Sequence, residues 1–452
     1  MRAICFLRSR ILKPALALLA ISCAIAAQGC INPASPGSND PAYSDNPVSS
    51  SDPAVPVAGD VLIAGGVGRL DQSLAPAEFF DPATGKFLIT GALTDGRAGS
   101  AAAVLAGGKV LLAGGFSGTA MINDFSLTLS GSVVPSADVF SPAAGKFVAT
   151  GLTIAPRAGY TATTLQSGKV LVAGGIDNRG NVLDSAELYD PASGKFSGIV
   201  TAMSDRRAFH TATLLPGGKV LVAGGVTDLS GGTTNSADLY DPLSDTFVQA
   251  AAMDHARAGH TATLFTFGPM AGSVLIAGGG GGTGLFLKDS SAEIYDSASG
   301  QFLLLRTFMN EARALHTATL LPDGRVLLAG GFDGSVAMAA GTLSGASGSI
   351  SDSAEIFDPA STQFSCIGGF NSDTTQCNPA MSFARAGQSA TLFNSGKLKG
   401  QILLAGGWGG RSTDAAGRPL SSAEIFDPAT STFRVTSNMN RARALQSATL
   451  LQ

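Results

Sequence analysis

The sequence has few charged residues, few cysteines and a single tryptophan, and these scarcities narrow the classes of protein it can belong to. Only 14% of its 452 residues are charged, whereas glycine occurs 58 times. Because glycine weakens helices and is common in turn-rich β structure, this composition argues against a helical protein. Disorder along the whole chain is excluded as well, since 45% of the residues are hydrophobic.

The N-terminus carries an apolar run, Pro14–Ala27, that is shorter than the roughly 20 residues a membrane-spanning helix needs. It follows a basic start made of Arg2, Arg8, Arg10 and Lys13. This pattern predicts a signal peptide over residues 1–29. The ending "AAQGC" resembles a bacterial lipoprotein signal, which implies lipid attachment at Cys30 and an exported, envelope-anchored protein at the outer membrane or cell surface. Processing at Cys23 and plain secretion remain alternatives.

Residues 30–58 are rich in proline, serine and asparagine and hold almost nothing that could enter a core. We interpret them as a flexible tether. Cleavage of the leader removes four of the 29 basic residues and none of the 33 acidic ones, which leaves a net charge of about −8. Such a surface does not favour nucleic acid as a partner.

The rest of the chain, residues 59–452, is a repeat. A double glycine recurs seven times, 49 to 76 residues apart, at Gly65-Gly66, Gly114-Gly115, Gly174-Gly175, Gly224-Gly225, Gly278-Gly279, Gly330-Gly331 and Gly406-Gly407. Each copy follows an apolar run such as "VLVA" and precedes a segment similar to "SAELYDPASGKF", then an arginine and another apolar strand signal. Four short strand signals per unit predict one four-stranded antiparallel sheet per repeat.

The glycine pair, the "LYDP" segment and the period near fifty residues resemble kelch repeats, in the variant found in galactose oxidase and many secreted bacterial proteins. The chain departs from that pattern by carrying phenylalanine where kelch repeats usually have tryptophan. The resemblance implies an all-β, seven-bladed β-propeller with four antiparallel strands, A to D, in each blade. Because the repeat region begins with a B strand and ends with an A strand, we expect the C-terminal strand to complete blade one.

The lengths of the connections indicate which face of the propeller has a function. The gaps after the glycine pairs range from 9 to 21 residues, whereas the acid of strand C and the phenylalanine of strand D are nine residues apart in every copy. The B–C and D–A connections lie on one face of such a propeller. Variable loops on a rigid scaffold commonly build binding surfaces, so we expect the B–C/D–A face to bind a ligand.

Seven arginines open the A strands, and seven acids begin the C strands at the same face. We interpret them as a structural ring of bidentate ion pairs, because a buried arginine without a partner would be costly. The ring consists of Arg97, Arg157, Arg207, Arg257, Arg313, Arg385 and Arg443 with Glu78, Asp138, Glu187, Asp238, Glu293, Glu355 and Glu424. Three residues further on, His210, His260 and His316 share one repeat position with tyrosine, glutamine and serine, so we assign them a structural role as well.

The resemblance also raises an enzyme as the alternative, since galactose oxidase uses a copper held by Tyr and His and a Tyr–Cys cross-link. Beyond Cys30, the mature chain has only Cys366 and Cys377, and its tyrosines lie in the tether or in the repeat frame. We therefore expect no metal, no cofactor and no catalytic residue. A carbohydrate-active enzyme of isomerase, lyase or oxidase type on the same face remains the alternative to a monomeric binding or scaffold module for a protein or glycan.

The longest D–A connection contains the segment "CIGGFNSDTTQC". An exported protein meets an oxidising compartment, so we predict a disulfide between Cys366 and Cys377 that closes this insertion into a finger beside the 332–352 loop. The ligand site that we predict consists of the finger, that loop and the neighbouring B–C loop. Its candidate residues are Trp408, Asp333, Phe370, Asp373 and Asp414.

Overall fold

The computed structural model describes residues 53–69, 72–123, 126–282, 285–339, 342–371, 376–410 and 418–452. The predicted leader and residues 30–52 of the predicted tether, which include Cys30, lie outside these ranges, as do Asp373 and Asp414. The described residues are β strands and turns, with two three-residue 3₁₀ helices, Ala106–Gly108 and Pro142–Ala144. Within them, no helix has the length and apolar character needed to cross a membrane.

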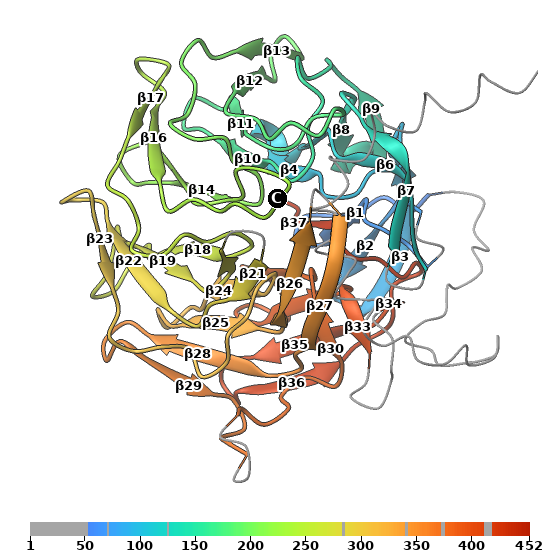
Figure 1. Cartoon of the computed structure of the whole chain (residues 1–452). Helices are drawn as coiled ribbons and strands as arrows, with labels where there is room; N and C mark the ends of the chain where they lie inside the picture. Colours follow the sequence, from blue (N-terminus) through green and yellow to red (C-terminus); the bar gives the residue numbers. More distant parts are fainter. Residues whose placement is uncertain are drawn as a thin grey trace, which may run out of the picture.

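Seven four-stranded antiparallel sheets in the described part of the chain form the blades of a propeller, as predicted (Figure 1). In the order A, B, C, D they are β37 (Ser447–Leu450), β1 (Val61–Ala64), β2 (Pro76–Asp81) and β3 (Lys86–Ala92); β4 (Ala101–Val104), β5 (Val110–Ala113), β8 (Ala137–Ser141) and β9 (Lys146–Ala149); β10 (Thr161–Thr164), β11 (Val170–Ala173), β12 (Ala186–Asp190) and β13 (Lys195–Gly198); β14 (Thr211–Leu214), β15 (Val220–Ala223), β16 (Ala237–Asp241) and β17 (Thr246–Gln249); β18 (Thr261–Leu264), β19 (Val274–Ala277), β22 (Ala292–Asp296) and β23 (Gln301–Leu304); β24 (Thr317–Leu320), β25 (Val326–Ala329), β28 (Ala354–Asp358) and β29 (Gln363–Cys366); β31 (Ser389–Leu392), β32 (Ile402–Ala405), β35 (Ala423–Asp427) and β36 (Thr432–Val435).

The ring closes through blade one, where the last strand of the chain joins the first. β37 pairs with β1 in an antiparallel register that sets Val61 opposite Leu450 and Ala64 opposite Ser447. Each A strand also packs against the A strands of both neighbouring blades, and β37 lies between β4 and β31 (Figure 1). The predicted closure by the C-terminal strand is therefore confirmed, and it leaves no open blade edge inside the ring.

The blades pack face to face through two repeated features. All four residues of each B strand are buried, because a B strand lies between the two neighbouring sheets. In every blade the aromatic residue of strand C packs on the phenylalanine of strand D, with ring centroids 4.8 to 5.1 Å apart. This aromatic pair occupies the outer part of the blade, where phenylalanine takes the place of the usual kelch tryptophan.

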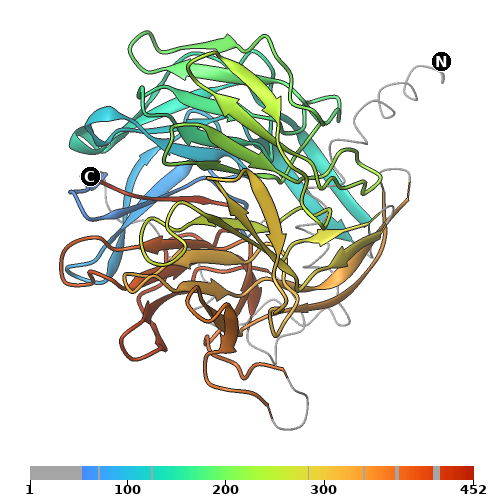
Figure 2. The same ribbon diagram turned by 90° about the vertical axis from the view of Figure 1, so that its left-hand side faces the viewer.

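Additional β structure lies only on the side of the B–C and D–A connections within the described ranges. β6 (Phe116–Asn123) and β7 (Ser126–Val133) form a hairpin in blade two. The insertions of blades five and six share one sheet of β20 (Gly280–Gly281), β21 (Leu285–Lys288), β26 (Phe332–Ala339) and β27 (Thr342–Ile350). β30 (Ala384–Ala386), β33 (Trp408–Gly410) and β34 (Arg418–Pro419) form a third small sheet. Figure 2 shows the two long hairpins on the same side of the ring.

Candidate functional site

The seven arginines that open the A strands are fully buried, and each forms an ion pair with the acid of its own blade's C strand. The distances between nitrogen and oxygen are 2.6 to 2.8 Å. The pairs are Arg97–Asp138, Arg157–Glu187, Arg207–Asp238, Arg257–Glu293, Arg313–Glu355, Arg385–Glu424 and Arg443–Glu78. The predicted structural pairing is present in all seven blades.

The pairing differs in one respect from the bidentate contact that we expected. In blade four, Nη2 of Arg207 meets one carboxylate oxygen of Asp238 at 2.6 Å, while Nη1 donates to the carbonyl oxygen of Gly224 at 2.8 Å. The guanidinium divides its donors in this way because the buried carbonyls of the glycine turn also need partners. The carboxylates of these pairs also accept hydrogen bonds from backbone N–H groups. Glu187 accepts the backbone N–H groups of Ile154 and Ala155, which fastens the D–A connection.

Three residues after each arginine lies a second ring of polar side chains, and six of its seven members bond to the preceding blade. Nε2 of His210 lies 3.0 Å from the Thr161 hydroxyl, and Gln388 donates from Nε2 to the Ala329 carbonyl at 2.8 Å. The Tyr160 hydroxyl bonds to the backbone of blade two in the same manner. The structural role assigned to this position is therefore supported by its contacts.

These buried groups are neutral at physiological pH. Burial, together with the nearby arginines, lowers the pKa of His210 and of His316 to about 3. The pKa of His260 is lowered well below its ordinary value for the same reason. Burial raises the pKa of Tyr160 to about 12. The second ring therefore carries no charge.

Between the two rings lies a position that our sequence predictions missed. The residue two places after each arginine donates its backbone N–H to the carbonyl of the equivalent residue in the preceding blade, at 2.8 to 3.3 Å. The seven bonds form an unbroken circle through Gly99, Gly159, Phe209, Gly259, Leu315, Gly387 and Leu445. All seven have left-handed backbone conformation, with φ from 54° to 66°. Glycine at four of the seven equivalent positions was the available signal for this conformation.

This circle surrounds the mouth of the central channel on the B–C/D–A face. Together with the residues that follow it in sequence, it lines a cavity of about 310 Å³. A bulky L-residue in the left-handed region costs about 1 to 2 kcal/mol, so Phe209, Leu315 and Leu445 are strained where four other blades use glycine. The strain marks the channel mouth as a candidate binding site.

Trp408 lies in the blade-seven B–C connection, as predicted, but its side chain is buried. Its side chain is only 2% exposed and packs with Val67, Ala98 and Ala444. It is the blade-seven member of the position directly after the glycine pair, which is buried in the other blades as well; those residues are Val67, Phe116, Ile176, Val226, Gly280 and Phe332. A direct ligand contact does not follow from this position, because the indole is part of the core.

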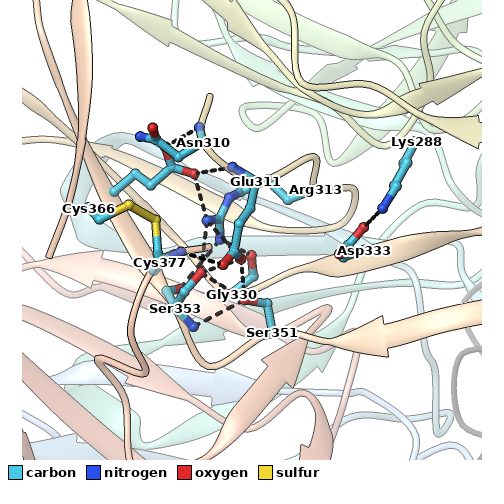
Figure 3. Close-up of polar contacts among 12 residues, drawn as sticks. Lys288, Asn310, Glu311, Arg313, Gly330, Asp333, Ser351, Ser353, Cys366 and Cys377 are labelled. Carbon is cyan, nitrogen blue, oxygen red and sulfur yellow. Dashed lines mark hydrogen bonds and ion pairs between the residues drawn. A yellow bond between two sulfur atoms is a disulfide. The ribbon is translucent and has the colours of Figure 1, made fainter. Parts of the chain in front are cut away.

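Asp333 and Phe370 are described, and each has its own partner. The Asp333 carboxylate is bound by the Lys288 ammonium, which ties the blade-six insertion to that of blade five (Figure 3). Phe370 is 55% exposed and pairs through its backbone with Cys377. In Figures 1 and 2 the segment that follows β29 leaves the rim of the ring, away from the β26–β27 hairpin. The described part of the finger thus projects away from this hairpin, and the shared site remains a prediction.

The predicted disulfide is present. Cys366 and Cys377 are bonded, with their Cα atoms 5.3 Å apart. The backbone N–H of Cys377 donates to Oε1 of Glu311 at 3.1 Å, and Oε2 of Glu311 accepts hydrogen bonds from the Ser351 and Ser353 hydroxyls (Figure 3). The base of the finger is thus fixed to the strand end beside the Arg313–Glu355 pair.

The described residues do not fit a copper centre with a Tyr–Cys cross-link. Tyr189, Tyr240 and Tyr295 are buried in the aromatic pairs of their blades, and both described cysteines are in the disulfide. Across the described ranges, no three or more His, Cys, Asp or Glu side chains are grouped so that they could hold a metal ion. The donor set expected of such an oxidase is therefore not assembled by these residues.

Comparisons with known proteins agree with the fold. The Kelch motif model matches residues 156–201 and 391–440. One similar solved structure is a fungal alcohol oxidase of the AA5 family in complex with copper, with 17% identity and a TM-score of 0.58, which covers 84% of this chain and 75% of that chain. Another is YjhT, with 13% identity and a TM-score of 0.50, covering 75% of this chain and 97% of that chain. No curated protein sequence matches.

The repeated strands and the glycine pairs define the class: the protein is a β-propeller, and two of its segments, residues 156–201 and 391–440, match the Kelch motif. At 13% and 17% identity the solved structures share the fold alone. The copper of the fungal oxidase is thus a property of that protein. A kelch propeller is compatible with a binding, scaffold or catalytic role, and the choice among these depends on the site.

Proposed function

We propose that this kelch propeller is a binding or scaffold module of the bacterial cell envelope that captures a protein partner through its B–C/D–A face. The observation that carries this proposal is that, within the described ranges, β structure outside the blades lies only on the B–C/D–A face. The β6–β7 hairpin and the four-stranded sheet of the blade-five and blade-six insertions lie on this side, outside the blades. Loops and hairpins that project from a rigid ring are where recognition surfaces are commonly built.

A protein partner is favoured over a glycan by the kind of structure that the insertions form. Within the described residues, β6–β7 is a two-stranded sheet, so each of its strands has one edge without a neighbouring strand. Such an edge presents backbone N–H and C=O groups that an extended peptide can pair with by strand addition. A glycan, and a carbohydrate-active enzyme on the same face, remain the rival functions that the binding experiment must separate.

The envelope location is part of the proposal and depends on Cys30. If the lipid is attached there, the Cys30→Ser protein will move from the detergent phase to the aqueous phase in a detergent partition assay. An unchanged distribution would contradict lipid anchoring at this residue. Capture through the propeller face is tested separately, so the two parts of the proposal can fail independently.

The capture experiment shortens the blade-six insertion to the nine-residue length that blade three has at the same place. The wild-type and shortened proteins are cross-linked in intact cells, and the partners are identified by quantitative mass spectrometry. We expect a specific partner to be lost from the shortened protein while the melting temperature changes little. The matched control shortens the longer A–B turn of blade seven, residues 394–401, on the opposite face. Equal partner recovery from all three proteins, or recovery of glycans alone, would contradict the proposal.

A further inference from the structure

The mouth of the channel has a collar of three large apolar side chains. Phe209, Leu315 and Leu445 line the 310 Å³ cavity together with the glycines of the same circle. Around this hydrogen-bonded circle, large and small residues alternate. A Cβ atom at Gly159 would lie 2.9 Å from the Phe209 ring, and one at Gly387 would lie 3.2 Å from a Leu445 methyl group. Each large side chain therefore lies over the glycine of the preceding blade.

The alternation leaves one open side. Because seven is an odd number, two small residues must be neighbours, and they are Gly99 of blade two and Gly159 of blade three. The next position in blade two is Ser100, the smallest member of the second ring. A Cβ atom at Gly99 would have no neighbour closer than 3.9 Å, so this part of the rim has space. The collar is thus closed by apolar side chains on most of its circumference and open at blades two and three.

The cavity is uncharged, and its polar groups are either hydrogen-bonded or covered. Nδ1 of His210, His260 and His316 and Oε1 of Gln388 and Gln446 have no hydrogen-bond partner among the described residues, but these five atoms are buried rather than exposed to the cavity. Every arginine near it is paired with a carboxylate, and the histidines are neutral. The Tyr160 hydroxyl, Nε2 of His210 and Nε2 of Gln388 are bonded to neighbouring blades. A charged group would lose its hydration here without an ionic partner, and sugar hydroxyls would reach few hydrogen-bonding groups, because the unpartnered ones are covered. An apolar group suits these surroundings better.

We propose that the collar of Phe209, Leu315 and Leu445 is a pocket for one apolar side chain, aliphatic or aromatic, of the captured protein. This inference rests on the proposed function and names the anchor of that interaction. Interfaces commonly concentrate their affinity in a few buried apolar anchors surrounded by weaker contacts. The strained backbone is consistent with this role, because glycine maintains the same hydrogen-bonded circle in the four other blades.

The first test uses small probes and the full propeller. N-acetyl-leucinamide and N-acetyl-phenylalaninamide are compared with the lysine and glutamate analogues and with neutral methyl glycosides. Saturation-transfer NMR reports binding, and the methyl resonances of Leu315 and Leu445 in labelled protein report its place. We expect the two apolar probes to shift these resonances and the charged probes and glycosides to leave them unchanged. Binding of glycosides at these methyl groups, or no response to the apolar probes, would overturn the inference.

Variants separate binding from folding. Phe209→Gly introduces the residue that blades two, three, five and seven use, so we expect an unchanged or higher melting temperature and apolar-probe binding at least about tenfold weaker. Gly99→Leu should block the open side with the same loss of binding. Phe267→Gly is the matched control, since Phe267 is 44% exposed and lies in an A–B turn on the opposite face. A fall in melting temperature for Phe209→Gly with unchanged binding would show that the collar is only structural.

The same variants distinguish the inference from the proposed function. The Phe209→Gly protein could capture the cellular partner as well as the wild type does, while the protein with the shortened blade-six insertion does not. In that case the inference that the collar binds the partner is wrong, and the proposed capture through the B–C/D–A face is supported. If the apolar probes bind in the collar but neither change affects partner recovery, the pocket exists and the proposed capture through this face is wrong.

Discussion

Arg443 and Glu78 are 365 residues apart in the sequence, yet Nη2 of Arg443 lies 2.7 Å from Oε1 of Glu78 and both side chains are buried. The arginine precedes β37, the last strand of the chain, and the acid lies in β2, which belongs to the same sheet. Glu78 also accepts the backbone N–H of Asn440 at 2.6 Å. This one carboxylate thus fastens the C-terminal segment to the N-terminal blade.

Replacing Glu78 by glutamine should destabilise the protein strongly. The change leaves the buried Arg443 guanidinium without a compensating charge, and removing one partner of a buried pair costs about 3 to 5 kcal/mol. Urea unfolding followed by circular dichroism measures this loss. The control is Asp323→Asn, which breaks the exposed Arg325–Asp323 pair on a surface turn and should cost less than about 1 kcal/mol. Equal effects of the two changes would contradict the role assigned to Glu78.

Deletion of residues 447–452 removes β37 and opens blade one. β1 then loses its four-residue ladder to β37, and the A strands β4 and β31 lose the neighbour between them. We expect loss of a single cooperative thermal transition and aggregation through the newly exposed strand edges. Differential scanning calorimetry and light scattering measure these two effects. A truncated protein that is monomeric and has an unchanged melting curve would contradict closure by this strand.

The features that occur in every repeat could be predicted from the sequence. The strand order, the arginine–acid pairs and the C–D aromatic pairs each occur seven times. Because of this repetition, a deviation in one copy does not hide the pattern. The same comparison would have placed Trp408 in the core, because the equivalent residues Val67 and Phe116 are apolar. Its place in the blade-seven B–C connection, on which we based the binding prediction, does not by itself expose the side chain.

The features that break the repeat could not be predicted. β21 pairs with β26, and these strands come from the B–C insertions of two different blades. No periodicity specifies such a pairing, since each insertion occurs once. Phe209 and Leu315 were also missed, because side-chain sterics disfavour their left-handed backbone and only the surrounding hydrogen-bonded circle enforces it. The candidate site at the channel mouth depends on these exceptions.

The disulfide at the base of the finger should stabilise the protein, although it lies at the rim. Closing a loop of this length contributes roughly 3 kcal/mol in the chain-entropy model. We expect Cys366→Ser with Cys377→Ser to lower the melting temperature, and reduction of the wild type to give the same value. Mass spectrometry of the exported protein should recover the two cysteine peptides as one cross-linked species before reduction. Free thiols in the exported protein would contradict the disulfide.

Acid should destabilise this propeller through its buried histidines. The pKa of His210 and of His316 is about 3 in the folded protein, whereas an unfolded histidine titrates near 6.5. As pH falls below about 6.5, the unfolded chain binds protons that the folded protein does not bind. The stability that these neutral side chains contribute is therefore fully present above about pH 6.5 and is lost progressively toward pH 3.

The second ring offers a matched substitution for testing this dependence, because Gln388 and Gln446 occupy the histidine position in blades seven and one. We expect the triple variant His210→Gln, His260→Gln and His316→Gln to lose less of its melting temperature than the wild type between pH 6.5 and 4. The reverse change, Gln388→His, should make the loss steeper, since it adds a fourth buried histidine at an equivalent place. Melting temperatures measured at closely spaced pH values in one buffer series check both. Parallel curves for the three proteins would show that the buried histidines do not govern acid stability.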